Sequence, residues 1–195
     1  MLHYFLLIFL FCFQSFSQNK FSDTGNREGE WRGYYGTGEL RYEGVFKDGK
    51  ETGIFKYYYK SGNLEMELLY IEDGVSAKVR IYYSNKNIKT LGEYCSKKRC
   101  GTWEYFDDSG NIIIKENYIQ GLLNGLYFTY YNGVLTDLYT YENGEKNGIS
   151  KSFFSNGQVK NIKNYLNDKL HGKFELFNKR GELIESMNYK NGFLE

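Results

Sequence analysis

The strongest constraint on the fold of this chain is a 24-residue unit that occurs seven times in succession after residue 28. The third unit opens with Ala77, and the others open with Gly29, Gly53, Gly101, Gly125, Gly148 and Gly172. A second glycine follows nine residues later in five units, at Gly38, Gly62, Gly110, Gly157 and Gly181. The third unit has Lys86 there, and the fifth, one residue shorter, reaches Gly133 early. Self-similarity at a fixed period predicts stacked repeats rather than a globule around one cleft.

Each unit contains two short runs of β-strand composition joined by a turn. In the second unit the runs are residues 54–59 and 64–70, and Gly62 between them can adopt the positive φ of a tight hairpin. The chain holds 20 tyrosines, 15 phenylalanines and no proline, and no stretch has the apolar spacing of an amphipathic helix. We therefore expect an all-β fold, an elongated single-layer antiparallel sheet of seven stacked β-hairpins, with residues 29–195 forming one domain. The opening glycines are expected at hairpin corners.

Three columns of the repeat are expected to carry the packing. Five residues after the opening position every unit has an aromatic residue, namely Tyr34, Tyr58, Tyr82, Phe106, Tyr130, Phe153 or Phe177. A second aromatic column, near the end of the second strand, is Phe46, Tyr70, Tyr94, Tyr118, Tyr141, Tyr165 and Tyr189. The aliphatic column between them is Leu40, Leu64, Ile88, Ile112, Leu135, Val159 and Leu183. A single hairpin is marginal in water, so burial of these columns between neighbours would stabilise the stack.

An aromatic stripe adjoins the first column and is the candidate binding surface: Tyr35, Tyr59, Tyr83, Tyr131 and Phe154, interrupted by Asp107 and Asn178. Adjacent residues of a strand face opposite sides, so the stripe should be exposed if the first column is buried. Rows of tyrosine suit protein or glycan recognition. The alternative is that the rings only stack across strands and stabilise a thin sheet.

The units also resemble a known repeat. The pattern Gly-x-Trp/Phe-x-x-Tyr/Phe-Tyr, then a glycine turn, then Tyr-x-x-Gly-x-x-x-Gly, is similar to the MORN-repeat variant of secreted bacterial proteins, and residues 29–31 and 101–103 match it best. Residues 168–172, ending in His171-Gly172, resemble the turn that closes the family's repeat. The resemblance covers residues 29–195, and many such chains are grouped as YwqK-family antitoxin-like proteins. It implies an elongated sheet used for protein or membrane contact, with no chemistry of its own.

The N-terminus has the pattern of a cleaved secretory signal. Residues 6–13 form an apolar core, and Ser15 and Ser17 are the small residues expected before a cut that precedes Gln18. The apolar core is short for a bilayer, which needs roughly 20 residues, although a retained anchor is the alternative. We therefore expect residues 1–17 to be a signal peptide and residues 18–28 a polar linker. The mature chain should then be secreted, periplasmic or attached to the cell envelope.

Few residues have the pattern of a catalytic or metal site. His171 would be the only histidine of the mature chain, and it occupies the repeat-closing segment, where a turn role is expected. Asp107 and Asp108 form an adjacent acidic pair, but they align with the hairpin turns, where aspartate accepts backbone hydrogen bonds. A metal site needs several converging ligands. The sequence thus predicts no catalytic residue, no metal and no cofactor.

Cys95 and Cys100 flank the one unit junction in which lysine, Lys97, replaces the mid-turn glycine. In an exported protein two cysteines this close are expected to form a disulfide. Their Cys-x-x-x-x-Cys spacing differs from that of the usual oxidoreductases, so the bond is expected to be structural.

Two classes of function remain after these considerations. The first is a non-enzymatic scaffold whose β-surface binds a protein or an envelope polymer, with a toxin-neutralising antitoxin or immunity protein as a special case. The second, less favoured, is a glycan-acting hydrolase, which would need two carboxylates about 5–10 Å apart across a groove. The 25 basic and 24 acidic residues are interleaved along the chain. The net charge is therefore too small to attract nucleic acid electrostatically. We expect a monomer without a transmembrane segment in the mature chain.

Overall fold

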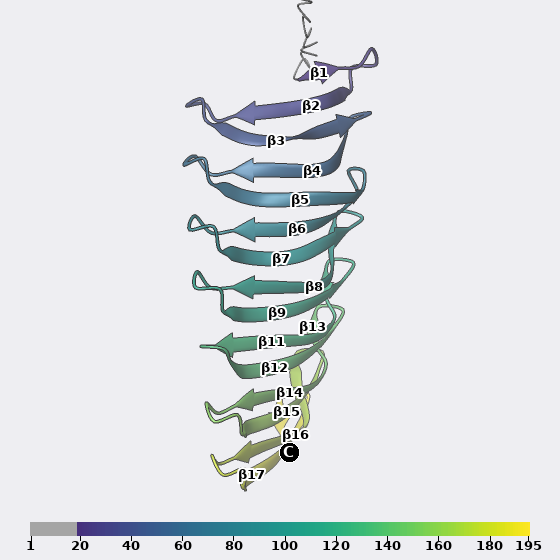
Figure 1. Ribbon diagram of the computed structural model, residues 1–195. Coiled ribbons are helices and arrows are strands. Elements are labelled where there is room, and N and C mark those ends of the chain that lie inside the picture. The colour runs from purple at the N-terminus through teal and green to yellow at the C-terminus, as the bar shows by residue number, and fades with distance from the viewer. Residues whose placement is uncertain (1–18) are drawn as a thin grey trace, which may run out of the picture.

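The computed structural model describes residues 19–195, and every strand in this range belongs to one antiparallel sheet whose long strands follow each other in chain order (Figure 1). The long strands are β2 (Arg27–Tyr34), β3 (Leu40–Lys47), β4 (Lys50–Tyr58), β5 (Leu64–Glu72), β6 (Ser76–Tyr82), β7 (Ile88–Cys95), β8 (Lys98–Phe106), β9 (Ile112–Ile119), β11 (Gly125–Tyr131), β12 (Val134–Glu142), β14 (Gly148–Phe153), β15 (Val159–Leu166), β16 (Lys169–Phe177) and β17 (Leu183–Lys190). Four two-residue strands join them: β1 (Lys20–Phe21), β10 (Leu122–Leu123), β13 (Glu145–Lys146) and β18 (Phe193–Leu194). The predicted all-β, single-layer stack of hairpins is confirmed.

Two kinds of turn connect the strands. Within a unit, the Gly38 amide donates to the Tyr35 carbonyl at 2.9 Å, and Gly38 has a φ of 101°, as the second glycine of the repeat predicts. Between units the chain reverses in two residues with positive φ, such as Asp48 (50°) and Gly49 (78°). Such turns match the right-handed twist of the strands they join. The reversal lies before the opening glycine, so the prediction that the opening glycines form hairpin corners is wrong.

Gly53, Gly101 and Gly172 instead lie inside strands, at bulges, whereas Gly125 and Gly148 begin β11 and β14. Between β3 and β4, Glu43 pairs with Lys56 and Val45 with Thr52, so Gly44 alone faces residues 53–55. Gly53 has a φ of 64°, which an L-residue adopts only with strain. In unit three, where Ala77 replaces the glycine, pairing between β5 and β6 runs without a shift from Met66–Ile81 to Tyr70–Ala77.

The core lies on one face of the sheet, which we call the packed face. This face carries Trp31, Phe55, Val79 and Trp103, each of which lies two residues after the opening position of its unit. Phe55 and Trp103 are only 1% exposed. Phe46 joins them, since its ring centroid lies 5.7 Å from that of Trp31 and 5.1 Å from that of Phe55, both edge to face. These contacts run from hairpin to hairpin and hold the stack together.

Residue sizes on the packed face are matched between neighbouring units. A Cβ atom on Gly44 would lie 2.5 Å from the Phe55 ring, and one on Gly92 would lie 2.3 Å from the Trp103 ring. Leu68, which corresponds to these glycines, pairs with the smaller Val79. Phe55 and Trp103 therefore each require glycine in the unit before them, whereas Phe174 pairs with the long Lys163.

The predicted packing columns are only partly correct. Phe46 is buried as expected, but Tyr34, in the first aromatic column, is 54% exposed. Tyr34 pairs with Leu40, so both columns lie on the opposite side of the sheet from Trp31. We call this side, which carries Arg32, the open face.

The start of the described chain covers the first unit. Part of the segment predicted as a polar linker forms β1, which pairs with β2. The Trp31 Nε1 donates to the Lys20 carbonyl at 3.1 Å, and the Phe21 ring lies edge to face on Trp31 at 5.0 Å. Residues 19–195 contain no helix that is long and apolar enough to span a membrane. The predicted signal peptide, residues 1–17, lies outside the described part of the chain.

Candidate interaction surface

A row of alternating charges crosses the open face. Successive cross-strand pairs run from Arg32 to Glu43, Lys56, Glu67 and Arg80, one residue per strand. Ion pairs form within the same row, between Arg32 and Glu43 at 3.2 Å and, further along, between Lys115 and Glu104 at 2.9 Å. Opposite charges on directly facing positions stabilise a sheet and set its register.

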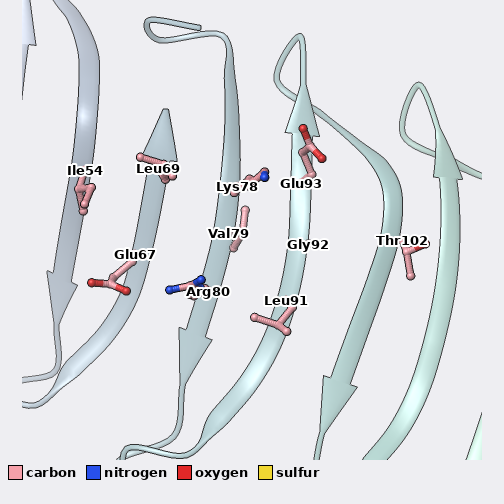
Figure 2. Close-up of a pocket in the computed structure, with 10 residues that line it drawn as sticks. All are labelled: Ile54, Glu67, Leu69, Lys78, Val79, Arg80, Leu91, Gly92, Glu93 and Thr102. Carbon is pink, nitrogen blue, oxygen red and sulfur yellow. The ribbon is translucent and has the colours of Figure 1, made fainter. Parts of the chain in front are cut away.

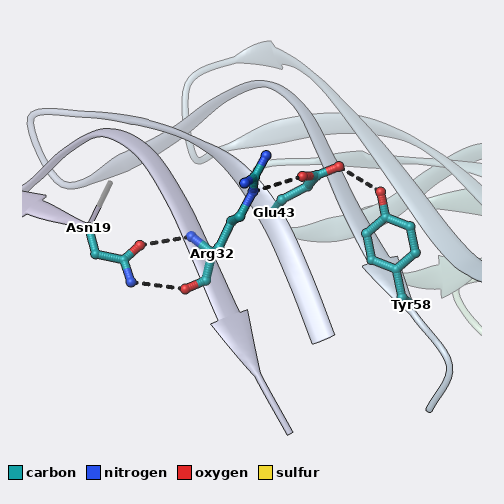
Figure 3. A network of polar contacts seen from close by, with 4 residues as sticks. All are labelled: Asn19, Arg32, Glu43 and Tyr58. Carbon is teal, nitrogen blue, oxygen red and sulfur yellow. Dashed lines mark hydrogen bonds and ion pairs between the residues drawn. The ribbon is translucent and has the colours of Figure 1, made fainter. Parts of the chain in front are cut away.

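Hydroxyl groups of the first aromatic column bind this row. Figure 3 shows Glu43 accepting from the Arg32 Nε and, at 2.6 Å, from the Tyr58 hydroxyl. In the same network Asn19 makes two hydrogen bonds with the backbone of Arg32, which fix the N-terminal segment on β2. The hydrogen bond from Tyr58, aided by Arg32, lowers the pKa of Glu43. Tyr82 repeats the contact one unit later, donating to Glu67 at 2.8 Å.

Alkaline pH is expected to destabilise the sheet. Burial, together with the neighbouring carboxylates Glu43 and Glu51, raises the pKa values of Tyr58 and Tyr70 to about 12 from the ordinary 10.0. Because the folded pKa is the higher one, this stabilisation is complete below pH 10 and is lost as the pH rises through 12. Urea unfolding between about pH 8 and pH 11 should show a falling free energy of unfolding. The fall should be smaller in Y58F/Y70F; an equal fall would contradict the assignment.

Apolar side chains are also exposed on the open face. Ile54 is 52% exposed and pairs with Leu69, which is also exposed. Both line a hollow of about 320 Å³ with Leu91, and Figure 2 shows charged side chains around it: Glu67, Lys78, Arg80 and Glu93. A second hollow, about 250 Å³, shares Ile54 and extends along β2–β4. Sequence reasoning missed this surface, although aliphatic residues directly after the opening glycine, such as Ile54, indicate it.

The predicted binding stripe is not a continuous exposed row of rings. The hydroxyls of Tyr35, Tyr59 and Tyr83 each donate to a backbone carbonyl of the next unit, those of Tyr58, Tyr82 and Phe106, at 2.7–2.8 Å. These three rings are half-buried and tie neighbouring hairpins together. Tyr131, in the short fifth unit, is 72% exposed and lines an apolar notch of about 310 Å³ with Phe154. The stripe is therefore divided into three tie residues and a separate notch.

Five segments of the chain match the MORN repeat variant, at residues 27–48, 51–72, 99–120, 146–167 and 170–191. Together they make up more than half of the chain. The chain belongs to this repeat family. The intervening segments are unit three, which has Ala77 and Lys86 in place of glycines, and the shortened unit five. The match confirms the MORN-repeat part of the resemblance seen in the sequence.

Comparison with curated proteins found no match. Among solved structures, the MORN-repeat sheet is similar to a crystal structure of TarM, with 13% identity and a TM-score of 0.31 over 61% of this chain and 19% of that one. A mutant of S. aureus TarM in complex with fondaparinux, alpha-GlcNAc-glycerol and UDP gives 12% identity and the same TM-score and coverage. The chain therefore spans only about a fifth of the TarM chain, and the similarity carries no argument about function.

The residues singled out for catalysis lie apart in the MORN-repeat sheet. His171 lies within β16 rather than in a turn, which corrects the prediction, and its buried Nδ1 has no hydrogen-bond partner among residues 19–195. Asp107 accepts from the amides of Ser109 and Asn111 at 3.0 and 2.8 Å, and hydrogen bonds, chiefly from Asn111, lower its pKa. This is the geometry of a turn-stabilising aspartate.

A disulfide joins Cys95 at the end of β7 to Cys100 in β8, with 5.7 Å between the Cα atoms. It spans the turn at Ser96 and Lys97, both of which have positive φ (50° and 63°) without being glycine. The disulfide therefore stabilises a chain reversal whose positive φ angles are unfavourable for serine and lysine. Glu93 places a carboxylate within 4.8 Å of both sulfurs, but sulfurs joined to each other are poor metal ligands.

Proposed function

We propose that this MORN-repeat chain is a non-enzymatic scaffold that binds a partner protein or envelope polymer on its open face, in the cell envelope or outside the cell. The observation that carries this proposal is the exposed apolar pair Ile54 and Leu69 within rows of both charge signs. The opposite face is used for packing, whereas this one leaves apolar area available. Exposed apolar side chains rimmed by charges are typical of protein interfaces.

The arrangement of the charges favours a protein partner. Acidic and basic residues alternate along the row from Arg32 to Arg80, so the surface presents no region of a single sign. A partner with complementary alternating charges would be selected by register as well as by sign. An antitoxin or immunity role is the special case in which the partner is a toxin, and export would place the chain where such partners act.

The proposal is tested with the partner recovered by pull-down with the full chain. Binding affinity would be measured for Ile54→Ser/Leu69→Ser and for a matched control, Leu126→Ser/Ile149→Ser, which changes similarly exposed residues of the same face in later units. We expect the first variant to bind at least about 30-fold more weakly, equal to about 2 kcal/mol at the centre of an interface. Both variants should keep the wild-type melting temperature.

Three outcomes would contradict the proposal. If both variants bound the partner with equal affinity, the hollow around Ile54 would be excluded as the binding site. Loss of affinity only in Tyr131→Ser/Phe154→Ser would place recognition at the notch instead. Turnover of a glycan that disappears in Glu67→Gln/Glu93→Gln would indicate the hydrolase class, since these carboxylates share one hollow.

A further inference from the structure

In three units of the sheet, a cation near the opening glycine lies over two aromatic rings. The cation comes from the position two residues before the opening glycine. Arg27 lies 5.0 Å from the ring centroids of both Trp31 and Phe46. In unit four, Arg99 lies 4.5 Å from Trp103 and 5.4 Å from Tyr118, and in unit six Lys146 lies over Tyr139 and Tyr165 at 4.4 and 5.5 Å. All these distances are within the reach of a cation–π interaction, about 6 Å.

The junction between units two and three has a tyrosine on each side but no cation, and Val79 stands where units one and four have Trp31 and Trp103. Its residue at the cation position is Val75, which lines a recess of about 260 Å³ together with Tyr70, Ala77 and Tyr94. Tyr70 and Tyr94 pair with Ala77 from opposite sides. Since neighbouring strands lie about 4.8 Å apart, the two tyrosines start from strands about 10 Å apart. The Tyr70 ring lies edge to face on Phe55 at 5.7 Å and the Tyr94 ring on Trp103 at 5.3 Å, so both rings are held in place where they line the recess.

A carboxylate completes the recess. Glu51 lines it from β4, and no hydrogen bond or ion pair to its carboxylate occurs within residues 19–195. Glu51 contributes, after burial, to the raised pKa of Tyr70, which is consistent with its position beside that ring. Unit four has the complete set within the chain, because Arg99 also forms an ion pair with Glu116 at 4.0 Å. Unit four thus holds two rings, a carboxylate and a cation, and the recess holds two rings and a carboxylate.

We propose that the recess between Tyr70 and Tyr94 binds the guanidinium group of an arginine side chain presented by another polypeptide. Two rings supply cation–π attraction, and Glu51 supplies charge and hydrogen-bond acceptors. Leu68, Val75 and Ala77 form an apolar floor for the side chain's methylenes. The site lies on the packed face and is independent of the open-face surface proposed above.

Lys97 is the one basic residue that lines the recess. Its amide donates to the Val75 carbonyl at 2.9 Å, and its side chain is exposed at the rim. Its charge opposes a bound guanidinium, so Lys97→Ser is expected to strengthen binding about two- to five-fold, the size of a weak exposed charge interaction.

The test is an NMR titration of the tyrosine ring signals of the full chain with N-acetyl-Gly-Arg-Gly amide. The control peptide carries citrulline, the neutral isostere of arginine. We expect saturable shifts of the Tyr70 and Tyr94 signals with the arginine peptide only. Ethylguanidinium, the head group alone, should shift the same signals with lower affinity, which separates recognition of the cation from recognition of the peptide. The open-face variant Ile54→Ser/Leu69→Ser should bind the peptide normally, so this result does not depend on the proposed function.

Three variants make the assignment specific. Val75→Arg should fill the recess from within, as Arg99 does in unit four, and abolish peptide binding. Glu51→Gln, which changes a partly exposed side chain and leaves the backbone unaltered, should weaken it at least ten-fold. Arg99→Val should create a second site, reported by the Tyr118 signal. Equal binding of the arginine and citrulline peptides, or undiminished binding by both Val75→Arg and Glu51→Gln, would overturn the proposal.

Discussion

Replacement of Trp103 by alanine is expected to lower the free energy of unfolding by about 3–5 kcal/mol, the usual cost of removing a large buried aromatic side chain. The Trp103 ring is 1% exposed and lies edge to face on Tyr94 at 5.3 Å, below the Arg99 guanidinium. Its Nε1 also donates to the Glu93 carbonyl at 3.2 Å, an acceptor that would lose this partner. Urea denaturation followed by circular dichroism would measure the loss.

The position of Trp103 adds a second expectation. In a repeat array each unit contacts mainly its neighbours, and Trp103 lies in the fourth of seven units. Its removal weakens the interface between the two halves, so unfolding should broaden or divide into two phases. Tyr131→Ala is the matched control, since this ring is 72% exposed and should cost less than about 1 kcal/mol. Equal losses in the two variants would show that the packed face is not the stabilising core.

The fold could be predicted because it depends on the period of the sequence. The recurring glycines and paired apolar runs were sufficient for the hairpins and their number. The core column could not be found in the same way, because residue type varies along it from Trp31 and Phe55 to Val79 and Ser150. Phe55 faces Gly44 and Val79 pairs with Leu68 of the preceding unit, so the residue type at each position depends on its neighbour and the column has no constant residue. The constant aromatic column lies on the open face instead, where the Tyr58 and Tyr82 hydroxyls donate to Glu43 and Glu67.

The candidate site was harder to predict than the fold for a related reason. The three tie residues Tyr35, Tyr59 and Tyr83 looked available for binding, but each hydroxyl is bonded to a carbonyl 23 residues further along. That contact depends on the shape of the turn, which alternation within a strand does not describe. The exposed Ile54, in contrast, follows from alternation once Phe55 is known to be buried.

Size matching between units leads to a prediction about glycine. Gly92→Ala is expected to destabilise the protein by about 1–3 kcal/mol, because the new Cβ would lie 2.3 Å from the rigid Trp103 ring. The φ of Gly92 is not positive, so steric contact alone causes the loss. Gly36→Ala is the matched control, since nothing lies within 4 Å of its added Cβ and its φ is not positive either. It should leave the melting temperature unchanged.

The steric origin of this loss can be isolated with a double-mutant cycle. Trp103→Val is costly by itself, because it opens a cavity, but it also removes the ring that the new methyl group would meet. Gly92→Ala/Trp103→Val would approach the pairing of Leu68 with the smaller Val79 between units two and three. We therefore expect the double variant to be more stable than the sum of the single losses, by at least about 1 kcal/mol, the coupling expected of side chains in contact. Urea denaturation of the four proteins gives the coupling free energy, and strictly additive losses would contradict size matching between Gly92 and Trp103, where one MORN repeat joins the next.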